Sequence, residues 1–182
     1  HMSNEQPSQN LGVTYRPKIF GRVLGNRSTI QALREGAASG TLGNALLFSG
    51  PAGSGKTTLS MILGRAVNCE APRKDGSPCN KCEACLDDGG VVYNDCAANG
   101  NKDAILNLVA QQRVQALYKR RVVILDECHA LSYGGTGAAT TLLTAMEDPN
   151  CKTLWLLCTN LPEKLSEAMR SRCTVYALQS PP

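Results

Sequence analysis

A glycine-rich segment near the first third of the chain has the residue types that bind a polyphosphate. Residues 50–57 read GPAGSGKT, which fits the pattern G-x-x-x-x-G-K-[ST]. Glycines let the backbone curl so that successive N–H groups point inward around phosphate oxygens, at the positive end of the following helix. In this pattern Lys56 reaches the terminal phosphates and the Thr57 hydroxyl ligates Mg²⁺. A glycine-rich turn with a solvated lysine is the alternative, but the segment stands between a predicted strand and a predicted helix.

Two acids stand at the end of the most apolar predicted strand. Asp126 and Glu127 follow four consecutive aliphatic residues. Parallel strands bring their carboxyl ends to one edge of a sheet, so we expect this pair beside the phosphate loop. There Asp126 would hold Mg²⁺ through water, and Glu127 would polarise the water that attacks the γ-phosphate. The alternative is an acidic cap of the strand, and for the adjacent His129 we expect a structural role.

Four of the nine cysteines fall within one short stretch. Cys79, Cys82 and Cys85 are spaced C-x-x-C-x-x-C, and Cys69 precedes them by ten residues. Four thiolates complete a tetrahedral Zn²⁺ site, and such a closed site has no open coordination position, so its role is structural. We therefore predict a zinc-binding insertion over residues 69–90. A redox pair or a set of free thiols is the alternative.

The overall composition narrows the class of protein. The chain has 182 residues, of which 42% are hydrophobic, and this suits one domain. No apolar run is long enough to span a membrane and no export signal begins the sequence, so we expect a cytoplasmic protein without a membrane partner or a disulfide framework. A net charge of +4 permits a polyanionic partner without predicting one. The five cysteines outside the cluster are expected to be small buried hydrophobes: Cys96, Cys128, Cys151, Cys158 and Cys173.

Alternating strands and helices are predicted to position these motifs. Short apolar runs predict strands over residues 44–49, 91–95, 121–126, 153–158 and 173–178. Apolar residues at helical spacing predict helices over residues 28–38, 57–67, 102–118, 136–147 and 162–172. Nearly continuous apolar strands that alternate with helices favour an α/β fold, with a parallel five-stranded sheet flanked by helices.

Two short motifs near the C-terminus are weak evidence alone but informative together with the phosphate loop and the cysteine insertion. A polar pair, Thr159 and Asn160, ends one predicted strand, and residues 171–173 read SRC. Together with the phosphate loop, the sequence DECH at 126–129 and the cysteine insertion, they make the chain from about residue 15 onward resemble the bacterial clamp-loader ATPases of the DNA polymerase III gamma/tau type. A cysteine insertion directly after the phosphate-loop helix resembles this group rather than AAA+ proteins in general.

The resemblance implies an AAA+ P-loop domain whose oligomer opens a ring-shaped sliding clamp and loads it at a primer–template junction. The implied cofactors are ATP, Mg²⁺ and Zn²⁺, and the implied partners are other clamp-loader subunits, the clamp, and DNA bound without sequence specificity. Asn160, with Thr159 as the alternative, would sense the γ-phosphate. Arg172 would be an arginine finger for ATP held by a neighbouring subunit, because its fixed cation stabilises transition-state charge. In this chain alone Arg172 would face solvent, and a purely structural arginine is the alternative.

The resemblance also assigns residues around the nucleotide and divides the chain. The adenosine would be bordered by Tyr15, Arg16, Pro17, Val23 and Leu24. The phosphates and the metal would contact Pro51, Ala52, Gly53, Ser54, Gly55, Lys56, Thr57 and Thr58. Residues 1–12 are expected to be a tag remnant and flexible tail, and residues 13–182 the nucleotide-binding domain. The family's lid and collar would lie beyond Pro182, so we expect an excised domain with poor turnover as a monomer.

Nucleic acid contact follows from the resemblance through helix ends. In the family, helix N-termini inside a spiral follow the template phosphates, a geometry that helix dipoles favour. The candidates here are residues 99–102 and 134–136, with plain helix caps as the alternative. Residues 119–121 read KRR and are expected to form a solvated turn. Asn26 replaces a glutamine common in the family, which leaves the base preference open.

Two other functions compete with an ATPase motor. One is a stator-like clamp-loader subunit that binds its partners and never hydrolyses ATP; the intact Lys56, Thr57 and Glu127 argue against it. The other is a P-loop small-molecule kinase with a zinc-stapled lid. The sequence shows no acceptor pocket or phosphate-clamping arginines for a kinase, and a kinase has no use for the SRC sequence.

Overall fold

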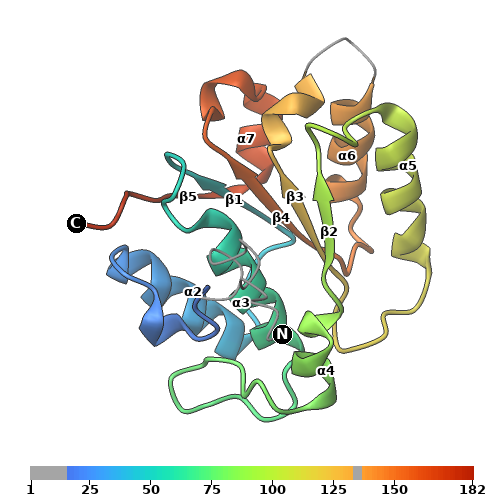
Figure 1. The fold of residues 1–182 in the computed structure, drawn as a ribbon. Helices are drawn as coiled ribbons and strands as arrows, with labels where there is room; N and C mark the ends of the chain where they lie inside the picture. Colours follow the sequence, from blue (N-terminus) through green and yellow to red (C-terminus); the bar gives the residue numbers. More distant parts are fainter. Residues whose placement is uncertain (1–15, 133–136) are drawn as a thin grey trace, which may run out of the picture.

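Five short apolar segments form the strands of one parallel sheet, as their nearly continuous hydrophobicity predicts. The computed structural model describes residues 16–132 and 137–182. Its strands are β1 Ala45–Ser49, β2 Val92–Asp95, β3 Val122–Asp126, β4 Leu154–Thr159 and β5 Thr174–Ala177. They lie in the order β2-β3-β4-β1-β5, and every neighbouring pair is parallel (Figure 1). The predicted α/β fold with a parallel five-stranded sheet is confirmed.

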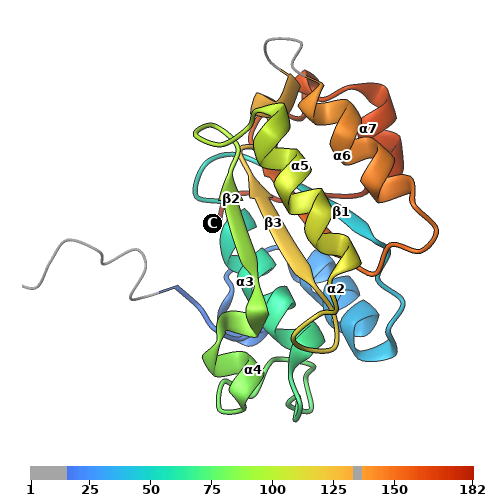
Figure 2. The ribbon, with the colours of Figure 1, turned by 90° about the vertical axis from the view of Figure 1, so that its right-hand side faces the viewer.

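Helices cover both faces of this sheet. They are α2 Arg27–Ser39, α3 Lys56–Asn68, α4 Glu83–Leu86, α5 Lys102–Ala110, α6 Ala138–Glu147 and α7 Glu167–Arg172. On one face, Leu33 of α2 and Leu59 of α3 share an apolar cluster with Phe48 of β1. On the other face, α5, α6 and α7 pack around Trp155, and Figure 2 shows these three helices together. β1 and β4 are buried along their whole length, so the sheet centre is the core of the domain.

Two predicted helices are shorter in the structure than their sequence pattern indicates. The helix predicted over 102–118 ends at Ala110, and a 3-10 turn, η3 Gln111–Arg113, follows it. The Arg121 guanidinium donates to the Gln111 carbonyl (3.0 Å), which satisfies a group at the helix end, and Val114 is extended. The predicted element 162–172 is divided into η5 Pro162–Lys164 and α7, because Leu165 turns into the core with extended backbone.

The cysteine-bearing insertion packs against the end of α3. It contains α4 and a 3-10 turn, η2 Asp88–Gly90, and lies at the foot of the molecule beside α3 (Figure 1). Gly89 has a φ of 70°, and a Cβ there would lie 2.7 Å from the Gly64 carbonyl oxygen of α3. Only glycine permits this approach, so the return of the insertion to the sheet depends on it.

The remaining 3-10 turns are η1 Phe20–Arg22 before α2 and η4 Cys128–Ser132 after β3. Within the described residues, no helix has the length and apolar character needed to cross a membrane.

The cysteines predicted to be small buried hydrophobes are buried at four positions and half-buried at Cys173. The predicted helix over 136–147 is α6, and its first predicted residue lies outside the described residues.

Candidate nucleotide and metal sites

The phosphate loop joins β1 to α3 at the carboxyl edge of the sheet. Gly53 and Gly55 adopt left-handed backbone conformations, with φ of 79° and 93°. At Gly50 a Cβ would lie 2.5 Å from the Leu178 carbonyl oxygen, so a side chain is excluded there. The Lys56 ammonium donates to the Gly50 carbonyl (2.7 Å) and the Pro51 carbonyl (3.0 Å). The loop thus folds around the lysine head group at the N-terminus of α3.

The carboxylate of Asp126 lies directly beside this loop. The Thr57 hydroxyl donates to its Oδ2 at 3.2 Å, and the Tyr93 hydroxyl donates to the same oxygen at 2.6 Å. The backbone N–H of Glu127 donates to Oδ1 at 3.0 Å. Thr57 and Asp126, the two predicted magnesium ligands, are therefore neighbours although 69 residues separate them. Two oxygen ligands at the mouth of a phosphate loop suit Mg²⁺.

Glu127 is held at the end of β3 by a line of hydrogen-bonding groups. Its backbone is left-handed (φ 52°), which turns the side chain away from the strand direction. Its Oε2 lies 3.5 Å from Nε2 of His129, and Nδ1 of His129 lies 2.8 Å from the Thr159 hydroxyl. The Thr159 hydroxyl also accepts from the Leu161 N–H (3.0 Å), which fixes its position at the end of β4. The buried His129 therefore links Glu127 to the end of β4, whereas Asn160 is exposed.

A cavity of about 400 Å³ opens at this edge of the sheet, and nine described residues line it. They are Arg16, Ala52, Gly53, Gly55, Lys56, Thr57, Thr58, Asp126 and Glu127. Its volume is within the range of small-molecule sites. Of the residues assigned to adenosine, Val23 and Leu24 line a separate hollow of about 390 Å³ with Phe20 and Arg34. Pro17, which follows Arg16 in the sequence, is half-buried and lines neither hollow. Tyr15 lies outside the described residues.

Arg172 stands apart from this cavity, at the end of α7. Its Nε lies 2.8 Å from Oε1 of Glu147, the last residue of α6, and the two side chains are 56% and 39% exposed. Arg172, which we expect to face solvent, is thus half-exposed and forms an ion pair. α6 and α7 cover the sheet face opposite α3, and the exposed part of the Arg172 side chain is open to a molecule outside this chain.

The four clustered cysteines meet at one point. Their Sγ atoms all lie within 4.8 Å of one another, and Sγ of Cys79 lies 3.9 Å from that of Cys85. Four sulfurs around zinc at about 2.3 Å each would be about 3.8 Å apart. Backbone N–H groups of Lys81 and Cys82 donate to the Cys79 sulfur at 3.3 and 3.2 Å. These donors lower the pKa of Cys79 to about 6, which favours the metal-binding thiolate.

A buried cation lies on α3, the helix against which the cysteine insertion packs. Arg65 is 6% exposed, and its Nε finds no hydrogen-bond partner among the described residues. Its ion pair with Asp88 is long, at 3.7 Å, and Asp88 is largely exposed. Burial lowers the pKa of Arg65, whereas the neighbouring Asp88 and Cys85 raise it; burial also raises the pKa of Cys85, to about 12. A tetrathiolate zinc site carries net negative charge, so a buried arginine beside it fits the predicted metal.

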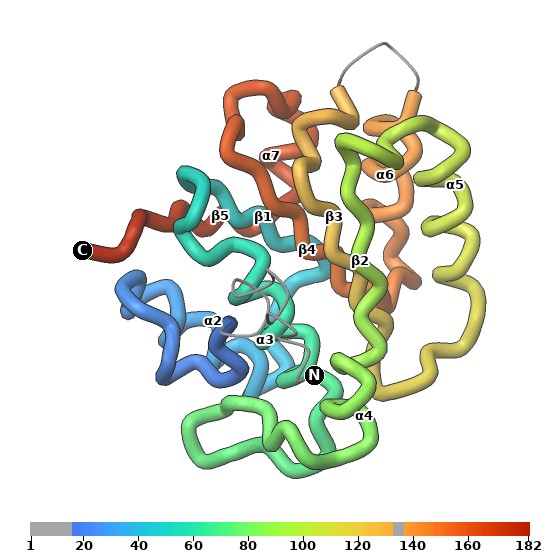
Figure 3. The backbone as a smooth tube through the Cα atoms, viewed as in Figure 1, coloured from blue at the N-terminus to red at the C-terminus, as the bar shows by residue number. Residues whose placement is uncertain are grey.

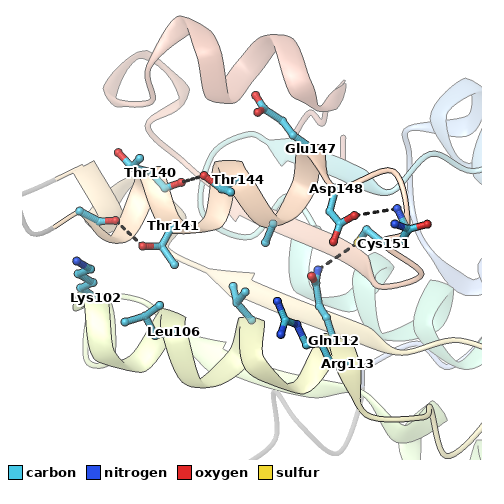
Figure 4. Close-up of a pocket in the computed structure, with 14 residues that line it drawn as sticks. Lys102, Leu106, Gln112, Arg113, Thr140, Thr141, Thr144, Glu147, Asp148 and Cys151 are labelled. Atoms are coloured by element: carbon cyan, nitrogen blue, oxygen red, sulfur yellow. Dashed lines mark hydrogen bonds between the residues drawn. The ribbon is translucent and has the colours of Figure 1, made fainter.

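A further hollow lies between α5 and α6, away from the phosphate loop (Figure 4). Its volume is about 1170 Å³. Lys102 stands at one end, where both helices begin, and a Cβ on Gly137 would lie 3.6 Å from the Lys102 side chain. Asn101, one of the residues proposed to contact DNA, accepts from the Ala104 N–H (2.8 Å) and caps α5. Residues 134–136, the other candidate, lie outside the described residues.

The comparisons with known proteins agree with this geometry. A family model described as DNA polymerase III, delta subunit, matches residues 25–182. The chain belongs to the clamp-loader family of DNA polymerase III. This clamp-loader domain is 34% identical over 171 residues to DNA polymerase III subunit tau of Bacillus subtilis, which covers 91% of the chain. It is 34% identical over 174 residues, 89% of the chain, to subunit gamma/tau of Mycobacterium bovis. The chain spans 30% and 29% of the lengths of these relatives.

Solved structures support the fold of the clamp-loader domain. A DNA polymerase III gamma subunit-related protein of Thermotoga maritima superposes with a TM-score of 0.60 and 22% identity. The match covers 86% of this chain and 47% of that one. Together with the parallel sheet, this likeness confirms the expected α/β fold.

Some contacts of the clamp-loader domain were not predicted from sequence. The hydroxyl of Tyr93 joins the Asp126 site, and burial and Asp126 raise its pKa. The Asn26 side chain pairs with the Gln179 backbone, donating from Nδ2 (2.9 Å) and accepting at Oδ1 (2.8 Å). The short apolar run at residues 91–93 predicts a strand there, but it does not identify the partner of the Tyr93 hydroxyl.

The expectation that residues 119–121 form a solvated turn is wrong, because two of their side chains bind backbone carbonyls of other segments. Lys119 donates to the Cys69 carbonyl at 2.6 Å, and Arg120 donates to the Lys152 carbonyl at 3.2 Å. Arg120 is half-buried, and burial lowers its pKa. The Cys69 carbonyl follows the end of α3, where carbonyls have no partner within the helix, and Lys152 lies just before β4.

Proposed function

We propose that this clamp-loader domain binds ATP with Mg²⁺ and hydrolyses it, as the motor that loads sliding clamps onto primer–template DNA during replication. The observation that carries the proposal is the 3.2 Å hydrogen bond from the Thr57 hydroxyl to Asp126. It brings the two oxygen ligands expected for magnesium to one cavity with Lys56 and Glu127. Residues 13–182 act as one nucleotide-binding domain, and residues 69–90 form its zinc-binding insertion.

In this proposal each residue at the sheet edge has one task. Backbone N–H groups of the loop and the Lys56 ammonium bind the phosphates, and Lys56 exchanges its bonds to loop carbonyls for bonds to phosphate oxygens. Thr57 and Asp126 hold Mg²⁺, which supplies charge neutralisation when bound. Glu127 orients the attacking water and accepts its proton, while the line through His129 and Thr159 keeps its carboxylate in place. The exposed Asn160 at the end of β4 would sense the γ-phosphate, with Thr159, which belongs to this line, as the alternative.

The partners follow from the position of Arg172. A half-exposed arginine on the sheet face opposite the phosphate-loop helix supports action on ATP bound by a neighbouring clamp-loader subunit. The site is then complete only in an oligomer. Glu147, the ion-pair partner of Arg172, is positioned to hold the guanidinium until that subunit docks.

DNA binding is proposed at the shared end of α5 and α6. The two helices begin beside each other, and Lys102 lies over the first turn of α6. Helix N-termini and a lysine together favour phosphate groups, which carry no sequence information. Binding at this end is therefore expected to be independent of sequence and to weaken steeply with salt.

The test is the steady-state ATPase rate of the complete clamp-loader assembly, with and without clamp and primed DNA. We expect stimulation by both, and loss of ATP binding in Lys56→Ala. Lys164→Ala, which removes an exposed lysine on η5, is the matched control and should behave as the wild type. An assembly that binds ATP at this site without turnover under any condition would identify a stator and contradict the motor.

A further inference from the structure

One segment of the chain connects the nucleotide cavity to the cysteine insertion. We call residues 16–25, which precede α2, the arm. Arg16 at its start lines the cavity with Lys56. Phe20 in its middle is 1% exposed and packs in the apolar cluster that contains Phe48 and Leu59. Those two residues belong to β1 and α3, the elements on either side of the phosphate loop. The arm therefore has a fixed centre and an end at the site.

The insertion supplies the polar contacts that hold the arm. The Ser77 hydroxyl accepts from the backbone N–H of Phe20 at 3.0 Å, and Ser77 is fully buried. The Asn80 side chain donates to the Lys18 carbonyl at 3.1 Å. Figure 3 shows the arm in dark blue and the insertion in green on the same side of the molecule. Two backbone groups of the arm thus depend on side chains 57 and 62 residues away.

A tight turn within the insertion fixes the position of Ser77. Asp75 accepts from the Ser77 N–H at 2.9 Å and from the Ser77 hydroxyl at 3.1 Å. The Ser77 hydroxyl therefore donates to Asp75 and accepts from the arm, so both of its roles are used. The Arg73 N–H closes the turn on the Ser77 carbonyl at 2.8 Å, and Arg34 of α2 donates to the Asp75 carbonyl at 2.6 Å. The turn is therefore rigid where it meets the arm.

Members of the cysteine cluster stand on both sides of this serine in the sequence. Cys79 and Cys82 flank Asn80, and Cys69 precedes the turn. Closing the four thiolates around a metal fixes both ends of the segment that carries Ser77 and Asn80. Opening the cluster would release that segment and leave the buried Phe20 N–H without its acceptor, a loss that costs free energy.

We propose that Ser77 is a positioning residue for the nucleotide, and that it couples metal binding by the cysteine insertion to nucleotide binding by the arm. The inference depends on the proposed function, because it assumes that the cavity beside Arg16 holds ATP. With the cluster closed, Ser77 and Asn80 order the arm before nucleotide arrives, so less ordering is needed on binding. Such coupling is reciprocal, so bound nucleotide in turn slows the loss of zinc.

The test compares Ser77→Ala with the wild type in the complete protein that contains this chain. Binding of a fluorescent ADP analogue is expected to weaken about fivefold, the equivalent of one lost hydrogen bond. Amide hydrogen exchange at Phe20 is expected to become faster, while zinc content stays unchanged. Lys74→Ala, an exposed change in the same turn, is the control and should alter neither quantity. Removing zinc from the wild type should reproduce both effects of Ser77→Ala.

Asn80→Gly gives a second, milder variant in case Ser77→Ala fails to fold. Glycine keeps the positive φ of 58° at this position and removes only the bond to the Lys18 carbonyl. Wild-type nucleotide affinity and wild-type exchange at Phe20 in the folded variant would overturn the proposal. Failure of the wild-type protein to bind nucleotide would instead contradict the proposed function itself, and the positioning role with it.

Discussion

At the scale of single residues, the site is organised around one carboxylate. Asp126 accepts from Thr57 and Tyr93 through one oxygen and from the Glu127 backbone through the other. Donors on both oxygens fix the orientation of the carboxylate plane. The phosphate loop and the two acids were predictable because their residues are adjacent in sequence. Tyr93 was not, because its contact joins residues 33 apart on different strands.

Replacing Tyr93 by phenylalanine tests whether its hydroxyl positions Asp126. Loss of one donor to a carboxylate should leave the side chain less well oriented for Mg²⁺, so the magnesium concentration that half-saturates ATP binding should rise about three- to tenfold. The measurement is a magnesium titration of nucleotide binding. Tyr118→Phe is the matched control, because Tyr118 donates to Asp87 at 2.7 Å in the insertion. Equal titrations for both variants would refute a role for Tyr93 in the metal site.

At the scale of elements, the apolar pattern predicted all five strands but not every helix end. The helices beyond Ala110 and around Leu165 were predicted too long, since hydrophobic spacing continues after the backbone has left the helix. Their ends depend on contacts with distant groups, such as the Arg121 guanidinium on the Gln111 carbonyl. The cap of α5 by Asn101 is local, and the preference of asparagine for that position makes it predictable.

Removal of this cap should destabilise α5 and the end of the molecule proposed to meet DNA. Asn101→Ala is expected to lower the free energy of unfolding by about 1 kcal/mol, measured by urea denaturation. Asn150→Ala, at an exposed turn after α6, is the control and should change it by less than about 0.5 kcal/mol. Equal stability of the two variants would show that the Asn101 bond to Ala104 contributes nothing.

The folding of the cysteine insertion is expected to depend on its bound metal. Cys82→Ser should reduce zinc from near one ion per chain to a small fraction and lower the melting temperature, because the insertion has little apolar core of its own. Elemental analysis and thermal unfolding measure the two effects. Cys173→Ala, a half-buried cysteine outside the cluster, should keep the zinc. A protein that is fully folded and free of metal would contradict the zinc assignment.

At the scale of the whole molecule, the sheet brings segments from the entire chain to one edge. The arm meets the insertion through Ser77, and Asn26 is bound to Gln179 across 153 residues. Such contacts depend on the strand order β2-β3-β4-β1-β5, which the sequence does not state. The fold class and the residues of the phosphate and metal sites were therefore open to prediction, whereas the groups that support them were not.

The opposite face of the sheet carries the proposed contact with a neighbouring subunit. In assemblies that mix Arg172→Ala and wild-type chains, ATP hydrolysis should be lost at the site of the adjoining subunit, about a thousandfold at each affected site. Site-resolved turnover in assemblies of defined order measures this. Arg170→Ala, an exposed arginine on the same helix, is the control. A defect confined to the nucleotide of the substituted chain itself would rule out action between subunits.

The most direct test of the account separates binding from hydrolysis at the end of β3. The experiment uses the complete assembly with clamp and primed DNA, in which every copy of this chain has the substitution Glu127→Gln. Glutamine keeps the size of the side chain and removes its basicity. The account predicts that ATP and Mg²⁺ bind with near wild-type affinity while single-turnover hydrolysis slows at least about a hundredfold. Hydrolysis at the wild-type rate, or an empty site at saturating ATP, would contradict it.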